Sequence, residues 1–121
     1  MTSELEVGLQ GEQSYRVTDE MGPAHLPVAV LSTPHMIGLI EQTCLASVAR
    51  HLPEGSTTVG THVCVSHKAA ASAGEDVTVH CRLAEVVKRR LRFEVSVTGP
   101  AGTLSEGTHE RAVVDLSRLS G

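Results

Sequence analysis

Hydrophobic residues follow two different periods along the chain, first a helical one and then an alternating one. Across residues 33–52 the apolar positions recur every three or four residues, and the first half of this segment is apolar nearly all round. Residues 59–67, 77–83 and 91–97 instead alternate between apolar and polar side chains, as half-buried strands do. The pattern therefore predicts one buried helix followed by an antiparallel meander.

The segments around these elements complete the predicted order. Residues 13–18 are expected to form a short first strand, and residues 19–31, which include glycine and proline, are expected to form a loop that can cover a site. Turns are predicted at residues 87–89 and 99–102, and a last strand at residues 103–116. No repeat or low-complexity boundary interrupts this order, so residues 1–121 are interpreted as a single domain.

The composition excludes one broad class of partner. The chain of 121 residues is long enough to bury a core without disulfide or metal cross-links. Its formal net charge is −4, and it contains one Tyr, one Phe and no Trp. Nucleic-acid binders need a basic surface and commonly stack bases on aromatic rings, so no nucleic-acid partner is expected.

The cysteines and the apolar runs bear on the cellular compartment. Cys44, Cys64 and Cys81 form an odd set without a C-x-x-C spacing, which predicts neither a disulfide framework nor a zinc ribbon; all three are expected to be small core residues. No apolar run reaches the ~18 residues that a membrane-spanning helix needs. Residues 1–6 carry neither the basic nor the apolar part of a secretory signal. A cytoplasmic protein with no membrane partner is therefore expected.

Glu41 is a lone carboxylate on the apolar face of the predicted helix. At a turn of about 100° per residue, five apolar positions lie within roughly 60° of it. These positions are Ile37, Cys44, Leu45, Val48 and Leu52. An ionised carboxylate in such a setting needs hydrogen-bond donors or takes up a proton. Glu41 is thus either a catalytic group or a buried residue satisfied by backbone or arginine donors, and the residues alone favour neither.

Two further residues have both a structural and a chemical interpretation. Thr33 precedes Pro34 and an apolar run, which is the signature of a helix N-cap followed by proline at the first helical position. Its hydroxyl can alternatively hydrogen-bond an acyl oxygen. His67 shares its strand face with an apolar row that includes Val59. It is expected either as a satisfied core histidine or, beside Glu41, as an acid–base group.

The remaining histidines do not predict a metal site. His62 and His67 have opposite parity on one predicted strand and point to opposite faces, so a metal centre built from them and His109 is not expected. His109 and Arg111 share a face of the last strand. That pair is interpreted either as facing a substrate or as an ordinary ion-paired surface.

Three stretches of sequence resemble one known family. They are Thr33-Pro-His-Met-Ile-Gly-Leu-Ile-Glu41, Gly60-Thr-His-Val-Cys-Val-Ser-His67 and Gly107-Thr-His-Glu-Arg-Ala-Val-Val114, and they look like the corresponding motifs of the fluoroacetyl-CoA thioesterase family. The order of strand, loop, helix and four strands is also that of the hotdog fold. The resemblance implies an α+β hotdog fold, in which an antiparallel five-stranded sheet wraps around one central helix. It also implies a homodimeric acyl-CoA thioesterase without metal or organic cofactor.

The resemblance also assigns residues to a site. By similarity, the catalytic residues are Thr33, Glu41 and His67. The residues expected to bind substrate are Gly60, His109, Arg111 and Leu26, of which Gly60 falls on a glycine of the acyl pocket and Arg111 on an arginine near the substrate.

The reaction expected from these residues is hydrolysis of a short acyl thioester of CoA or of a carrier protein. Glu41 activates a water or attacks the carbonyl, His67 orients the carboxylate and protonates the leaving thiolate, and Thr33 with backbone N–H groups stabilises the oxyanion. Two other functions stay open because a fold does not decide chemistry. One is a lyase or hydratase acting at the β-carbon, and the other is a non-catalytic binder of small molecules.

The loop before the helix predicts a substrate preference. In the family member from which the name comes, aromatic lid residues help to close the pocket over the fluorinated acyl group. Residues 25–31 of this chain contain no Phe, Tyr or Trp. Smaller apolar residues predict a roomier pocket and a broader or different substrate range.

One basic cluster has two interpretations. It consists of Lys88, Arg89, Arg90 and Arg92. Such a run is usually a solvated hairpin, but arginine forks also match the geometry of nucleotide phosphates in CoA.

Overall fold

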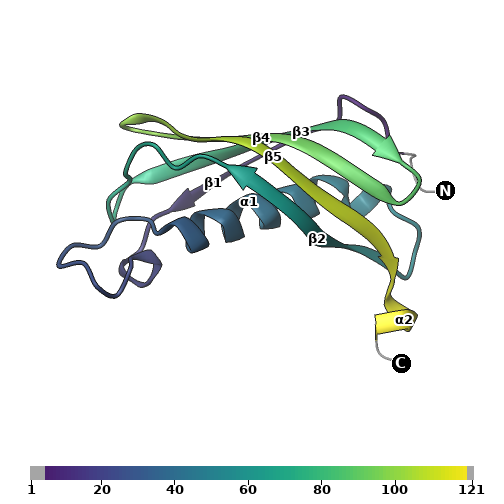
Figure 1. The fold of residues 1–121 in the computed structure, drawn as a ribbon, viewed down its shortest axis with the longest axis horizontal. Coiled ribbons are helices and arrows are strands. Elements are labelled where there is room, and N and C mark those ends of the chain that lie inside the picture. Colours follow the sequence, from purple (N-terminus) through teal and green to yellow (C-terminus); the bar gives the residue numbers. More distant parts are fainter. Residues whose placement is uncertain (1–4, 120–121) are drawn as a thin grey trace.

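A curled antiparallel sheet covers one long helix, as the computed structural model of residues 5–119 shows (Figure 1). In chain order the elements are β1 (Gln10–Arg16), η1 (Asp19–Met21), α1 (Thr33–Val48), η2 (Ala49–His51), β2 (Ser56–Val65), β3 (Asp76–Val87), β4 (Arg90–Gly99), β5 (Gly102–Asp115) and α2 (Leu116–Leu119). The expected order of elements is confirmed. The first strand lies earlier than residues 13–18, and α1 gives way to a 3-10 turn before residue 52. The expectation that residues 1–6 carry no secretory signal falls partly outside the described residues.

The strands are arranged in the order β1-β3-β4-β5-β2, and every neighbouring pair is antiparallel. The strands β1 and β2 are therefore the two edges of the sheet. Helix α1 runs beneath its concave side, and the loop between η1 and α1 lies at the end where α1 begins (Figure 1). Within residues 5–119, no helix is long and apolar enough to cross a membrane.

The core lies between α1 and the concave side of the sheet. Alternation in β3 and β4 sends every second side chain toward the helix, and Val77, Val79, Leu83, Leu91 and Phe93 are all fully buried. The helix contributes Met36, Leu39, Ile40, Cys44 and Val48. This apolar contact holds α1 in place and thereby fixes the positions of its polar residues.

Helix α1 is capped one residue earlier than expected. Ser32, not Thr33, is the N-cap, because its backbone is extended (φ −75°, ψ 156°) and its Oγ accepts a hydrogen bond from the His35 N–H at 3.3 Å. Thr33 is the first helical residue and Pro34 the second. The expectation that Thr33 is the cap is therefore wrong by one position, and its hydroxyl is free for another partner.

Strand β2 contains an irregularity that the alternation pattern hides. Its register against β5 shifts between Gly60 and His62, so that Thr61 is an extra residue. Val59 pairs with Ala112 and is 37% exposed, whereas Gly60 and Val63 pair with two buried residues of β5. The expectation that Val59 shares the face of His67 is wrong, because the extra residue reverses the parity of the strand.

The three cysteines do not share one environment. Cys44 and Cys81 are buried, and the interaction between their thiols raises the pKa of Cys44 and lowers that of Cys81. Cys64 is exposed on the edge strand β2. The expectation of three core cysteines is therefore wrong for Cys64.

Candidate functional site

Thr33 and His67 meet at the beginning of helix α1. Thr33 Oγ1 lies 2.7 Å from His67 Nδ1, a distance that makes a short hydrogen bond between two side chains that are far apart in sequence. Thr33 is brought there by the first turn of α1, and His67 by the chain that continues from β2 along β5. The sequence nominated both residues, but it did not predict their contact.

The loop before α1 forms one wall of a cavity at this contact. The cavity has a volume of about 310 Å³. Its lining is mostly apolar and consists of Pro23, His25, Leu26, Val30, Leu31, Ser32, Thr33, Pro34 and His67. Leu26 is 41% exposed at its rim. The loop thus lies beside Thr33 and His67 without covering them, since Thr33 is exposed, and Leu26 is placed where it can contact a ligand in the cavity.

Glu41 lies at the margin of the buried helix face and not at its centre. Its side chain is 43% exposed in the single chain, while Ile40 and Cys44 beside it are fully buried. A helical wheel places Glu41 among apolar residues correctly, but it does not show where the sheet above the helix ends. The carboxylate points into a second cavity of about 310 Å³, which it shares with Gly60, His62 and His109.

Gly60 leaves room for the carboxylate of Glu41. A Cβ atom at position 60 would lie 2.5 Å from Glu41 Oε1, closer than real Cβ atoms approach a neighbour. The carboxylate therefore occupies the space that a side chain on β2 would fill. This contact gives Gly60 a steric reason to be glycine that the sequence pattern alone did not contain.

Arg111 and His109 form a buried polar cluster behind Glu41. Arg111 is 5% exposed and His109 is 1% exposed, so neither belongs to an ion-paired surface. Arg111 Nε donates to Thr58 Oγ1 at 2.6 Å, and its Nη1 lies 3.6 Å from Glu41 Oε1. Burial lowers the pKa of both His109 and Arg111. The sequence reasoning missed Thr58, which lies two residues before Gly60 and faces the same side of β2.

The predicted catalytic residues fall into two groups within one chain. Thr33 and His67 share the cavity under the loop, whereas Glu41 lies with Gly60 and Arg111. Among the contacts of residues 5–119, none joins Glu41 to Thr33 or His67. The expectation that His67 orients Glu41 is therefore not met within a single chain.

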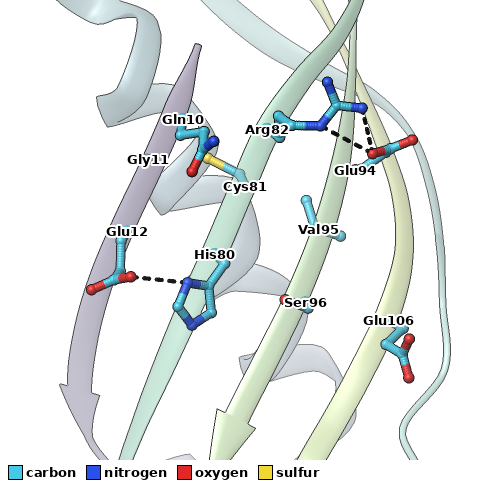
Figure 2. Close-up of a pocket in the computed structure, with 10 residues that line it drawn as sticks. All are labelled: Gln10, Gly11, Glu12, His80, Cys81, Arg82, Glu94, Val95, Ser96 and Glu106. Carbon is cyan, nitrogen blue, oxygen red and sulfur yellow. Dashed lines mark hydrogen bonds and ion pairs between the residues drawn. The ribbon is translucent and has the colours of Figure 1, made fainter. Parts of the chain in front are cut away.

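A third cavity lies elsewhere, on the outer face of the sheet. It has a volume of about 430 Å³ and contains none of the predicted catalytic residues. Figure 2 shows two pairs of its polar side chains in contact across neighbouring strands: Glu12 Oε1 lies 3.0 Å from His80 Nδ1, and Arg82 Nη2 donates to Glu94 Oε1 at 2.7 Å. These pairs describe a solvated outer surface of the sheet.

The basic cluster is interleaved with acidic residues. In the register of the sheet, Arg92 stands between Glu85 of β3 and Glu110 of β5. Arg90 Nη1 also lies 3.8 Å from Glu110 Oε1. This arrangement favours the interpretation of a solvated hairpin over that of a phosphate site.

Comparisons with known proteins agree on one family. The family model of FlK, described as fluoroacetyl-CoA-specific thioesterase, matches residues 13–117. A fluoroacetyl-CoA thioesterase from Streptantibioticus cattleyicolor is 40% identical over 91 residues, which make up 75% of this chain and 66% of that protein. The matched segment thus spans slightly less than two thirds of that relative.

Solved structures give the same result over more of the chain. The fluoroacetyl-CoA thioesterase FlK superposes with a TM-score of 0.92 at 32% identity, covering 98% of this chain and 94% of that one. A variant of FlK in complex with fluoroacetate and CoA superposes with a TM-score of 0.90 at 33% identity, covering 95% and 99%. A thioesterase superfamily member from Thermus thermophilus, at 22% identity and a TM-score of 0.86 over 95% and 88%, shows the shared fold. By sequence and by hotdog architecture, the chain belongs to the FlK family of fluoroacetyl-CoA-specific thioesterases.

Proposed function

We propose that this protein is a cytoplasmic enzyme that hydrolyses short acyl-CoA thioesters, with Thr33, Glu41 and His67 as its catalytic residues. The observation that carries the proposal is the 2.7 Å contact between Thr33 and His67 in the wall of an apolar cavity, in a chain of this family. The odd set of three cysteines fits a reducing compartment. No metal or organic cofactor takes part in the proposed reaction.

The Thr33–His67 contact supports two steps of the reaction. When the Thr33 hydroxyl donates to Nδ1, the proton of the neutral His67 ring is on Nε2, where it can be passed to a leaving thiolate. When Nδ1 donates instead, the Thr33 hydroxyl is free to donate to the carbonyl oxygen as negative charge develops there. Glu41 either activates a water or attacks the carbonyl, and both routes end in release of free CoA.

A homodimer accounts for the separation of Glu41 from the other two residues. Strand β2 is an edge of the sheet, and Val59, Val63 and Cys64 are exposed along it. An unpaired edge strand readily pairs with another strand, and a two-fold axis joins like edges antiparallel. We propose that two copies pair through β2 and complete two sites between them.

One register of this pairing brings the two groups together. In this register Cys64 stands opposite Cys64 of the partner subunit. Because Thr61 is an extra residue that takes no place in the pairing, Gly60 is three paired positions from Cys64 on one side, and His67 is three on the other. Gly60 therefore stands opposite His67 of the partner subunit. The two residues also face the same way, because Gly60 in β2 and His67 just after β2 both point to the inner side of the sheet. In this arrangement Glu41 of one subunit and the Thr33–His67 pair of the other act on one substrate.

The acyl preference is proposed to be broad. The lid residues that line the cavity near His67 include Leu26, Val30 and Leu31, which are smaller than Phe, Tyr or Trp. Losing one well-fitting contact changes discrimination by only ~1–3 kcal/mol, so a rate advantage for fluoroacetyl-CoA is expected to stay within about two powers of ten. A preference of several powers of ten for the fluorinated substrate over acetyl-CoA and longer acyl-CoAs would contradict this.

The test is the release of free CoA from such a panel by the wild-type chain, Glu41→Gln and His67→Ala. Each variant is expected to lose at least ~10²-fold in kcat, the usual span for acid–base groups. His80→Ala, on the outer face of the sheet, is the matched control and should keep the wild-type rate. Glu41→Gln at full rate would refute the assignment. Conversion of β-substituted acyl groups without release of CoA would instead support a lyase or hydratase.

A further inference from the structure

His109 is held by hydrogen bonds on both sides of its ring. Its Nδ1 lies 2.8 Å from the backbone oxygen of His62, and its Nε2 lies 3.1 Å from Arg111 Nη1. One face of the imidazole stacks on Phe93, with ring centroids 6.5 Å apart and an angle of 26° between the planes. At 1% exposure the ring is closed to solvent, so these partners account for both of its nitrogens.

The chemistry of these partners fixes the proton on the ring. A guanidinium group can only donate hydrogen bonds, so Nε2 of His109 must accept from Arg111. A carbonyl can only accept, so Nδ1 must carry the proton and donate to His62. The geometry therefore requires the neutral imidazole in its Nδ1–H tautomer.

The same contacts fix the orientation of Arg111. Its Nε and Nη2 donate to the side chain and the backbone oxygen of Thr58, at 2.6 and 2.9 Å, while His109 accepts from Nη1. These three acceptors are uncharged. Among the described residues, the carboxylate that pairs with Arg111 is Glu41, whose Oε1 lies 3.6 Å from Nη1. The contacts with Thr58 and His109 thus orient the guanidinium so that Nη1 points toward Glu41.

We propose that His109 is a positioning residue of the thioesterase site, which holds Arg111 so that Arg111 keeps the carboxylate of Glu41 beside Gly60. The inference rests on the proposed thioesterase function. It assigns no contact with substrate to His109. Its action is indirect, because an arginine without its Nη1 acceptor turns toward other partners and releases Glu41. Displacing a reacting group by about 1 Å can lower a rate by ~10²-fold.

The arrangement also predicts a dependence on pH. A second proton on His109 would set an Nε2–H against the N–H groups of Arg111 and remove the acceptor. Burial lowers the pKa of His109, and the charged and titratable groups that face it are Arg111 on its own strand, Glu41 on α1 and His62 on β2. The positioning is therefore intact at neutral pH and is lost in acid.

Two variants of His109 test the proposal. His109→Gln keeps one acceptor for Arg111 and one donor for the His62 carbonyl, and it does not titrate, whereas His109→Phe keeps only the ring packing. His109→Phe is expected to lower kcat for acetyl-CoA by ~10–100-fold with little change in KM, and His109→Gln is expected to restore most of that loss. In the pH profile of kcat, His109→Gln should keep its rate at lower pH than the wild type. His80→Ala, at a histidine on the outer face of the sheet, is the matched control and should keep the wild-type kcat.

A spectroscopic measurement keeps the proposal testable if His109→Phe does not fold. Long-range 15N–1H correlation spectra of the wild-type protein near pH 7 should show His109 as the neutral Nδ1–H tautomer. The Nε2–H tautomer or an imidazolium there would overturn the proposal, as would a wild-type kcat in His109→Phe. The rate of Glu41→Gln separates a failure of the proposed function from a failure of the role of His109. A wild-type rate in Glu41→Gln refutes the proposed function. An inactive Glu41→Gln together with a fully active His109→Phe refutes only the role of His109.

Discussion

Ser32 and Thr33 are adjacent residues with similar side chains, and the first turn of α1 gives them different partners. Ser32 Oγ accepts from the backbone N–H of His35, while Thr33 Oγ1 contacts His67 Nδ1. One hydroxyl therefore stabilises the helix, and the other is available to the proposed reaction. The two roles can be separated by substitution.

Removing each hydroxyl in turn should affect a different property. Ser32→Ala is expected to reduce the free energy of unfolding by ~1 kcal/mol, the usual cost of losing an N-cap, and to leave kcat nearly unchanged. Thr33→Val is expected to lower kcat by at least ~10-fold with little loss of stability, while Thr33→Ser keeps most of the rate. Thermal unfolding and CoA-release assays on the same samples check this. If Thr33→Val and Ser32→Ala had the same profile, Thr33 would be only a structural residue.

Mixing two inactive variants should restore activity if the site combines residues of two subunits. Glu41→Gln and His67→Ala are each expected to be inactive as homodimers. After unfolding and refolding together in equal amounts, half of the dimers are mixed, and each mixed dimer has one intact site, so the activity should return to about a quarter of the wild-type value. The control is refolding each variant alone. No recovery, in a sample shown to contain mixed dimers, would place all three groups in one chain.

The register proposed for β2 predicts a cross-link at Cys64. Directly opposed residues of antiparallel strands have Cα atoms about 4.5–5.5 Å apart, so a short reagent with two thiol-reactive groups, such as a bis-maleimide, should join two subunits through Cys64. Denaturing electrophoresis should then show a covalent dimer of the wild-type chain and none of Cys64→Ser. Cys44 and Cys81 are buried and serve as internal controls. An uncross-linked chain that light scattering shows to be dimeric would require a different register, and a 12.8 kDa monomer would contradict the dimer itself.

Adding a single methyl group at Gly60 should disturb Glu41 more than it disturbs the fold. Its Cβ would lie 2.5 Å from Glu41 Oε1, so the carboxylate must move, and Gly60→Ala is expected to lose ~10²-fold in kcat. Gly38→Ala is the control, because nothing lies within 4 Å of a Cβ there and alanine stabilises a helix by up to ~1 kcal/mol relative to glycine. Full activity in Gly60→Ala would show that the position of Glu41 seen here is not the reactive one.

Acid should destabilise the folded protein in part through His109. Burial lowers the pKa of this residue in the folded state below its ordinary value of 6.5, so the unfolded chain binds a proton that the folded chain does not. The contribution of the neutral ring to the free energy of unfolding is complete above pH 6.5 and is lost as the pH falls below that value. Urea unfolding between pH 7.5 and about 5 should therefore show a smaller loss of stability in His109→Gln than in the wild type. Equal losses in both proteins would contradict this.

The sequence predicted the elements well where one physical rule dominates. Alternation in β3 and β4 comes from strands with one buried face, and it located Val77, Val79, Leu91 and Phe93 in the core. It could not show the extra residue Thr61, because valines on either side of a bulge look like one continuous row. The order of strands in the sheet depends on contacts between distant segments, which local patterns do not contain.

The sequence nominated residues for the candidate site but not the contacts between them. Thr33, Glu41 and His67 were nominated from resemblance and apolar setting, yet the contact of Thr33 with His67 depends on where β2 ends relative to the start of α1. The burial of His109 and Arg111 depends on how β5 packs over the helix. The periodicity of apolar residues assigns each side chain to one face of a helix or strand, but it does not determine which other side chains it contacts.

The regularly paired residues of β2 make the spacing between Gly60 and His67 a fixed length in an otherwise adjustable protein. Thr61 stands outside the pairing with β5, so deleting it would leave Gly60 and His67 on the same side, whereas deleting a paired residue such as Val63 would turn one of the two to the solvent side, away from the helix. Insertions in the loops before α1 and after β2 change only how far the chain travels between elements. Natural or engineered variants of this protein should therefore tolerate length changes in those loops and, between Gly60 and His67, only the loss of the extra residue Thr61.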